Sequence, residues 1–259
     1  MSPAHWRLTV DPPASGAVNM ARDAAAMASS RADGAPRWRI YRWERPTISF
    51  GRHESARGYY AAERLTAAGV DAVRRPTGGR ALLHDHELTY CVTERITEGE
   101  SLRASVARFN AILLDALHRL DVPAVVVGRD GAPLRPVDGA PCFTEPGEGE
   151  IALDGRKLVG SAQQRDDGAL LQHGSIILAD DQPRLATLAT TPIARAAPAA
   201  TLMDARGIAP TVVQLIEALR NAITAAAVRA TGAPPIEAPS ATTPELLAHY
   251  ADPDWTWRH

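Results

Sequence analysis

The sequence is poor in cysteine, in long apolar runs and in net charge. Two cysteines among 259 residues cannot form a disulfide framework, which favours a reduced, cytoplasmic protein. The formal net charge is −2 at pH 7, so nothing indicates the basic surface of a nucleic-acid-binding protein. No apolar run approaches the roughly 20 residues of a membrane-spanning helix, and the start lacks the layout of a signal peptide. We therefore expect no nucleic-acid or membrane partner.

What the sequence does contain is a mixture of helical and strand patterns in one domain, residues 1–259. Two Asp-Gly pairs, Asp154-Gly155 and Asp167-Gly168, have the composition of type I′ hairpin turns. Because strands and helices do not alternate regularly, we expect an α/β (α+β) protein with a mixed, mostly antiparallel sheet. The expected helices are 15–32, 59–68, 101–120 and 211–232, and the expected strands include 38–43, 47–51, 122–127 and two around the glycine turn of 72–93.

The densest motif is RRPTGGRALLHDHELTY, Arg74 to Tyr90. The Gly78-Gly79 pair lets the backbone approach a ligand, because no Cβ stands in the way. Arg74, Arg75 and Arg80 bring three guanidinium groups to one turn, which suits phosphate or another anion. His84 and Asp85 end a short apolar strand and could face a pocket. The alternative is a glycine hairpin with exposed arginines; no Walker loop or G-x-G-x-x-G fingerprint supports nucleotide binding.

A second group of polar and small residues lies on two later strands. Lys157 follows the first Asp-Gly turn, and a lysine on a strand is usually a solvated edge residue. Gly160, Ser161 and Ala162 come next, and small residues on a strand allow a ligand to approach closely. Gln163 follows them, and His173 and Gly174 interrupt the apolar stretch LLQHGSIIL. Such residues either satisfy one another or line a cavity.

The two cysteines have different settings. Cys142 lies in a Pro/Gly/Glu-rich stretch, and a nearby lysine such as Lys157 could lower the pKa of its thiol and make it a nucleophile. Cys91, in LTYCVT, lies among apolar and β-branched residues and is expected to be an inert core thiol. No Cys/His spacing resembles a zinc site.

Three motifs in order, RRPTGGRALLHDHELTY, GRKLVGSAQQR and LLQHGSIIL, resemble those of the lipoate–protein ligase/octanoyltransferase family, which shares the biotin-protein-ligase catalytic fold. The segments WRLTVDPPASGAVNMARDAA and DPDWTWRH also fit, so the resemblance covers nearly the whole chain. ATP-dependent ligases of this family carry a third glycine and a Gly-Asn pair where this sequence has Arg80 and Glu87-Leu88. Cys142-Phe143 stands where the ligase-like, cysteine-dependent octanoyltransferases carry their nucleophile.

The resemblance implies acyl transfer in two steps, without ATP, metal or another cofactor. Cys142 would take the acyl group from octanoyl-acyl-carrier protein, and Lys157 would polarise the carbonyl and assist deprotonation. The acceptor would be a lysine on a lipoyl domain, such as that of the glycine cleavage H protein. The implied substrate- and acyl-binding residues are Arg74, Arg75, Thr77, Gly78, Gly79, Arg80, His84, Gly160, Ser161, Ala162, Gln163, His173 and Gly174.

Three alternatives stay open from the sequence. The chain could be an ATP-dependent lipoate–protein ligase that carries a cysteine. It could be an amidotransferase that moves octanoyl between lipoyl domains, although the cysteine of that enzyme lies elsewhere in its chain. It could also be a non-catalytic lipoyl-binding protein.

Overall fold

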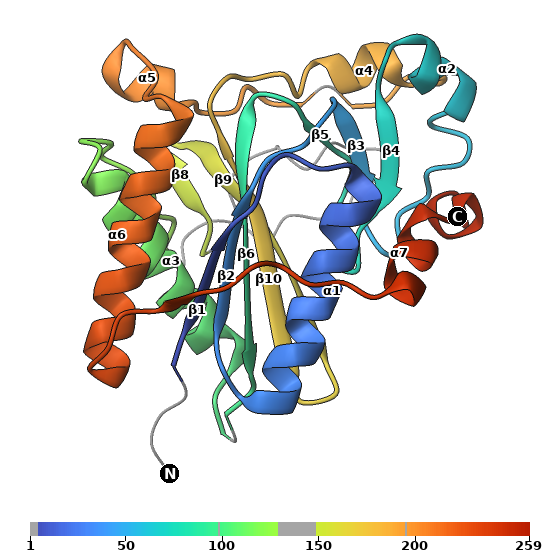
Figure 1. The fold of residues 1–259 in the computed structure, drawn as a ribbon. Helices are drawn as coiled ribbons and strands as arrows, with labels where there is room; N and C mark the ends of the chain where they lie inside the picture. Colours follow the sequence, from blue (N-terminus) through green and yellow to red (C-terminus); the bar gives the residue numbers. More distant parts are fainter. Residues whose placement is uncertain (1–4, 98, 129–148, 195) are drawn as a thin grey trace.

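Two sheets organise the computed structural model, which describes residues 5–97, 99–128, 149–194 and 196–259 (Figure 1). The larger sheet has eight strands in the order β11-β1-β2-β6-β10-β9-β8-β7, and the smaller has the order β4-β3-β5. Strands β11, β1 and β2 are parallel to one another, whereas β2 to β7 along this order pair antiparallel. The expected mixed, mostly antiparallel α/β architecture is confirmed. The strands are β1 (Arg7–Val10), β2 (Arg37–Tyr41), β3 (Thr47–Phe50), β4 (Asp71–Arg74), β5 (Leu82–His84), β6 (Glu87–Arg95), β7 (Val125–Val126), β8 (Ile151–Leu153), β9 (Arg156–Asp166), β10 (Ala169–Ile177) and β11 (Ile236–Glu237).

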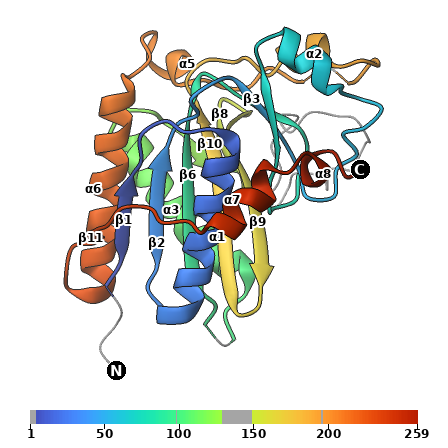
Figure 2. The same cartoon turned by 45° about the vertical axis from the view of Figure 1, so that its right-hand side comes forward.

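Helices cover both faces of the larger sheet (Figure 1). On one face, α3 and α6 pack together and bury the main apolar core around Trp38 and Tyr90. On the other face, α1 lies against β6 and β10, and α7 lies against α1 (Figure 2). No helix in the described residues is long and apolar enough to cross a membrane. The helices are α1 (Gly16–Asp33), α2 (Ala62–Ala67), α3 (Leu102–His118), α4 (Arg184–Leu188), α5 (Leu202–Arg206), α6 (Val212–Thr231), α7 (Pro244–Ala251) and α8 (Pro253–Thr256).

Local sequence signals place the long helices and the hairpins as expected. The Ser15 hydroxyl accepts a hydrogen bond from the Val18 amide and caps α1, and a capping box at Thr211 begins α6. Asp154 and Gly155 have φ values of 49° and 72°, as a type I′ turn requires. Asp167 and Gly168 repeat that geometry between β9 and β10.

Three expected elements differ from the structure. The strands on either side of Gly78-Gly79 do not form a hairpin, because β4 and β5 each pair with β3, which lies between them. The strand expected over 122–127 is reduced to β7, an exposed edge strand of two residues. The helix expected over 59–68 begins only at Ala62, because the Tyr59 and Tyr60 amides both donate to the Ala56 carbonyl in a separate turn.

Candidate functional site

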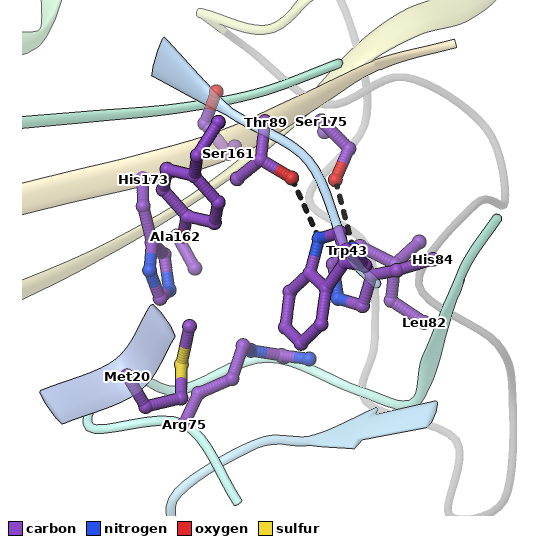
Figure 3. Close-up of a pocket in the computed structure, with 13 residues that line it drawn as sticks. Met20, Trp43, Arg75, Leu82, His84, Thr89, Ser161, Ala162, His173 and Ser175 are labelled. Carbon is purple, nitrogen blue, oxygen red and sulfur yellow. Dashed lines mark hydrogen bonds between the residues drawn. The ribbon is translucent and has the colours of Figure 1, made fainter. Parts of the chain in front are cut away.

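A cavity opens between α1, the sheet face that α1 covers, and the smaller sheet (Figure 3). It encloses about 350 Å³ of space between atoms, its open mouth included. The walls are mostly apolar surface, with two histidines on different sides. The lining residues are Met20, Tyr41, Trp43, Arg75, Leu82, His84, Thr89, Gly160, Ser161, Ala162, His173, Gly174 and Ser175.

Small residues on β9 and β10 form the floor of the cavity. Gly160 pairs with Ser175, and Gly174 pairs with Ser161, in the β9–β10 ladder. A Cβ at Gly174 would lie 2.4 Å from the carbonyl oxygen of Gly160 and 2.8 Å from Tyr90 Cε1, on the face opposite the cavity, so packing there requires glycine. The missing side chain of Gly160 is the one that leaves room on the cavity side.

His173 belongs to a buried chain of hydrogen bonds that starts on α1. Its Nδ1 lies 3.0 Å from Asp23 Oδ2, and its Nε2 lies 2.7 Å from the hydroxyl of Thr77. Asp23 also forms a buried ion pair with Arg39 and accepts a hydrogen bond of 2.8 Å from the Tyr41 hydroxyl. Burial alone would raise the pKa of Asp23, but Arg39 and His173 lower that pKa below its usual value. The carboxylate is thus ionised at neutral pH.

His84 belongs to a second chain of the same kind. Its Nδ1 lies 3.1 Å from Glu87 Oε1, and its Nε2 lies 2.6 Å from Ser49 Oγ. Its ring stacks on Trp43 with the ring centres 3.9 Å apart. The Trp43 indole donates to Thr89 (Figure 3) and also to Glu87. Burial lowers the pKa of His84. Burial opposes ionisation of Glu87 as well, but the adjacent imidazole lowers the pKa of Glu87 below its usual value.

The arginines of the turn do not form one anion site. The Arg74 guanidinium is buried away from the cavity, where it donates to the carbonyls of Gly51, Trp255 and Thr256. Arg74 therefore secures the C-terminal segment, contrary to the expected ligand-facing role. Arg75 lines the cavity and donates to the carbonyl oxygens of Ser49 and Arg80.

The remaining predicted residues of this motif lie behind or beside the cavity wall. Thr77 holds His173, and Gly79 lies over Ala162, whose Cβ is 4.0 Å from where a Gly79 Cβ would stand. Gly78 is half-buried in the same turn, and Arg80 is half-buried just after it. Asp85, expected with His84 to face a pocket, pairs with Arg184 at 2.7 Å instead.

On β9, the predicted residues divide between the two faces of the sheet. Gly160 and Ala162 face α1, and Ser161 hydrogen-bonds Tyr90 on the opposite face at 2.7 Å. Gln163 also faces away from the cavity and donates to Gln172.

Lys157 is buried, so the expectation that a lysine on a strand lies at a solvated edge is wrong here. Its side chain is only 5% exposed, and its Nζ lies 2.6 Å from Glu150 Oε1. It is not among the residues that line the cavity.

The structure describes one of the two cysteines, Cys91, whereas Cys142 lies outside the described residues. Cys91 is buried in β6, and burial together with the neighbouring Asp23 carboxylate raises the pKa of its thiol well above the ordinary value. The expected inert setting of Cys91 matches this environment.

Sequence reasoning missed the aromatic and apolar wall of the cavity. Met20, Tyr41 and Trp43 line the cavity, but the sequence patterns of their segments indicate only a helix and a strand. Asp23 was missed too, although an acidic residue inside the Ala-rich segment of α1 was a usable signal.

One group of potential metal ligands occurs in the described residues, apart from the cavity. Oxygen and nitrogen atoms of Asp85, His86 and Asp181 lie within 4.8 Å of one another. Arg184 already neutralises Asp85, and the backbone amide of His86 donates to Asp181. We assign no metal to this group.

Comparison with known proteins identifies relatives over most of the chain. The family model described as the lipoyl protein ligase A/B catalytic domain matches residues 15–230. The protein named octanoyltransferase LipM from Symbiobacterium thermophilum is 40% identical over 194 residues, which cover 73% of this chain and 70% of the relative. The protein of the same name from Carboxydothermus hydrogenoformans is 36% identical over 185 residues, covering 70% and 67%.

Solved structures show the same fold at lower sequence identity. A lipoate-protein ligase A bound with ATP has a TM-score of 0.75 at 20% identity, covering 98% of each chain. A chain from a structural analysis of a bi-partite lipoate protein ligase and its E2 lipoyl domain from Thermoplasma acidophilum has a TM-score of 0.74 at 19% identity. The match covers 98% of this chain and 96% of that chain.

Proposed function

This chain belongs to the lipoyl protein ligase A/B catalytic domain family, and we propose that within it the chain is an octanoyltransferase of lipoate biosynthesis. The family and the fold class expected from the sequence are confirmed. The relatives that match at 36–40% identity are named octanoyltransferases, which favours acyl transfer over ATP-dependent ligation. The enzyme is accordingly an acyltransferase.

The observation that carries the proposal is the apolar cavity between α1 and the two sheets. An octanoyl group has six methylene groups, and burying them would contribute about 5 kcal/mol of binding free energy. Trp43, Met20 and Leu82 supply apolar surface, and the glycine-bearing strands supply a floor of small residues. The cavity therefore has the chemistry of a short acyl-chain site.

Cys142 is the proposed nucleophile. Of the two cysteines in the chain, Cys91 is buried with a raised thiol pKa, so it is a poor source of thiolate. The Cys142 thiolate attacks the carbonyl carbon of the donor thioester, a new C–S bond forms, the C–S bond to the carrier breaks, and the carrier thiolate leaves and takes a proton from water. The neutral amine of an acceptor lysine then attacks the enzyme thioester, a C–N bond forms, the C–S bond to Cys142 breaks, the amine nitrogen gives one proton back to water, and the Cys142 thiolate is restored.

Lys157 is the proposed electrostatic partner of this chemistry. Its ammonium group is held by Glu150 at 2.6 Å in a buried setting, where a positive charge stabilises a developing oxyanion more strongly than in water. The donor is octanoyl-acyl-carrier protein, and the acceptor is a lipoyl domain such as that of the glycine cleavage H protein. No ATP, metal or cofactor enters these steps, because one thioester is exchanged for another. The single-domain organisation and the cytoplasmic location stay predictions.

The decisive experiment combines transfer without ATP and mass spectrometry of the intact protein. The wild-type chain should acquire an octanoyl adduct from octanoyl-acyl-carrier protein and pass it to apo-H protein. Cys142→Ala should abolish both, because the thioester cannot form. Cys91→Ser is the matched control and should keep both, because a serine hydroxyl replaces the buried thiol with a similar small donor.

Other outcomes would overturn the proposal in distinct ways. A strict requirement for ATP would indicate the ligase. Transfer from an octanoylated lipoyl domain but not from the carrier protein would indicate the amidotransferase. Absence of any adduct on the wild-type chain would indicate a non-catalytic lipoyl-binding protein.

A further inference from the structure

We propose that Asp23, on α1, is a positioning residue of the acyl site, because it fixes His173 and through it the turn Thr77–Gly79 that borders the cavity. The inference rests on the proposed function for the identity of the ligand, an octanoyl thioester. Asp23 does not touch the cavity itself.

The Asp23 carboxylate is completely buried among the donors Arg39, Tyr41 and His173, and the Cys91 thiol also lies beside it. Arg39 neutralises its charge through Oδ1, whereas Tyr41 and His173 both bond Oδ2, at 2.8 Å and 3.0 Å. A buried carboxylate is costly unless it is paired and hydrogen-bonded. These partners lie on β2 and β10, so Asp23 ties α1 to two strands of the larger sheet.

The carboxylate also decides which nitrogen of His173 carries the proton. An ionised carboxylate only accepts hydrogen bonds, so Nδ1 of His173 must carry the hydrogen that faces Asp23. Nε2 lies 2.7 Å from the Thr77 hydroxyl and is hydrogen-bonded to it. The position of the Thr77 side chain thus depends on the ring that Asp23 holds in place.

Thr77 transmits this restraint to the turn. The Thr77 carbonyl accepts a hydrogen bond of 2.8 Å from the Arg52 amide, so both ends of the residue are held. Two positions later, the Gly79 carbonyl oxygen stands 1.9 Å from where a Cβ of Gly51 would be, which leaves the turn almost no room on that side. Gly79 lies against Arg75 and Ala162, which both line the cavity, so loss of the Thr77 restraint would act on the wall that the acyl chain meets.

The test is binding of octanoyl-pantetheine, measured by calorimetry in the Cys142→Ala background, where no acyl transfer can occur. Thr77→Val, which keeps the shape but removes the hydroxyl, should weaken binding about tenfold, in line with the loss of one buried hydrogen bond. Thr77→Ser should restore it. Asp23→Asn should weaken binding at least as much as Thr77→Val, because it removes the charge that sets the His173 proton.

Asp11→Asn is the matched control for Asp23→Asn. Asp11 bonds the same buried Arg39, at 2.8 Å from its Nε, but no hydrogen bond or ion pair joins it to His173 among the described residues. Both variants should lower the unfolding free energy, and only Asp23→Asn should weaken binding. Equal weakening by both, or unchanged binding in Thr77→Val, would overturn the inference and leave Asp23 a purely structural residue.

The experiments distinguish a failure of the inference from a failure of the proposed function. If the wild-type chain does not transfer octanoyl groups, the proposed function is lost, while the ratio of binding constants still decides the role of Asp23. If octanoyl-pantetheine does not bind even with the turn intact, both are overturned.

Discussion

Two chains of carboxylate, histidine and hydroxyl flank the same cavity, and they differ in how they are held. In the chain of Glu87, His84 and Ser49, the Ser49 hydroxyl also accepts a hydrogen bond of 2.6 Å from Arg75. In the chain of Asp23, His173 and Thr77, the described residues give the Thr77 hydroxyl His173 as its one side-chain partner. The hydroxyl that ends the His84 side thus bonds a second side chain, whereas the hydroxyl that ends the His173 side bonds only His173 among the described side chains.

The difference also shows in the elements that each chain joins. Ser49 and His84 lie on paired strands of the smaller sheet, and Glu87 follows three positions after His84. Asp23, Thr77 and His173 come from a helix, a turn and a strand that are far apart in the sequence. Ser49, His84 and Glu87 are thus each part of a strand ladder, two in the smaller sheet and Glu87 in the larger, whereas Thr77 lies in a turn outside both sheets.

The largest expected effect is that of Gly51→Ala, which would displace the backbone of the turn on the His173 side. The new Cβ would meet the Gly79 carbonyl oxygen at 1.9 Å and its carbon at 2.7 Å, so one backbone segment must move. We expect a loss of about 3 kcal/mol in unfolding free energy, the upper range for overpacking, and a loss of octanoyl-pantetheine binding. Urea unfolding and calorimetry measure the two.

Gly128→Ala is the control for this prediction, since a Cβ there would meet no atom of the described residues within 4 Å. It should change neither quantity. If Gly51→Ala unfolded like the control, the turn would be more adaptable than its packing indicates, and the contrast between the two sides would fail.

A smaller effect is expected from breaking the His84 side, with Ser49→Ala. The substitution removes the partner of His84 Nε2 and one acceptor of Arg75, so a buried nitrogen loses its hydrogen bond at a cost of about 2 kcal/mol in unfolding free energy. Ser175→Ala is the graded control, because its hydroxyl lies 3.4 Å from His84 Nδ1 and should cost about 0.5 kcal/mol. Equal losses in the two variants would show that the short contact to Ser49 is not what stabilises His84.

The parts of this architecture that the sequence predicted are those decided by near neighbours. Ser15, Thr211 and the two Asp-Gly pairs act through residues within a few positions, so the helix starts and hairpin turns followed from local chemistry. The smaller sheet was not predictable in this way. Its central strand β3 pairs with β4 and β5 across intervening segments. The strands before and after Gly78-Gly79 therefore pair with β3 and not with each other.

The site was predictable in its motifs but not in the direction of its side chains. Arg74 donates to a carbonyl 181 positions along the chain. Nothing near Arg74 in the sequence indicates that carbonyls of the C-terminal segment will accept hydrogen bonds from its guanidinium. Lys157 is buried because Glu150 pairs with it and neighbouring strands cover it. His173 looked like a residue that either satisfies a neighbour or lines a cavity, and in the structure it does both.

The subtlest way to distinguish the two sides is acid titration of stability. Burial lowers the pKa of His84 below its ordinary 6.5, against the opposing influence of Glu87 and with help from Arg75 and His173. The neutral ring is therefore favoured in the folded state, so its contribution is fully present above pH 6.5 and is lost as the pH falls from 6.5 toward the folded value. Glu87 and Asp23 have lowered pKa values and affect stability only below their ordinary 4.5 and 3.8.

The measurement is urea unfolding of wild type and His84→Phe between pH 7 and 5, with Glu87→Gln added to both chains so that removal of His84 does not let the buried Glu87 carboxylate titrate in this window. Phenylalanine keeps the ring that stacks on Trp43 but cannot be protonated, so its unfolding free energy should fall less steeply with acid than that of wild type. If His84→Phe instead fell as steeply as wild type, the acid sensitivity would arise elsewhere, and the His84 side would be held by packing and not by the charge state of its ring.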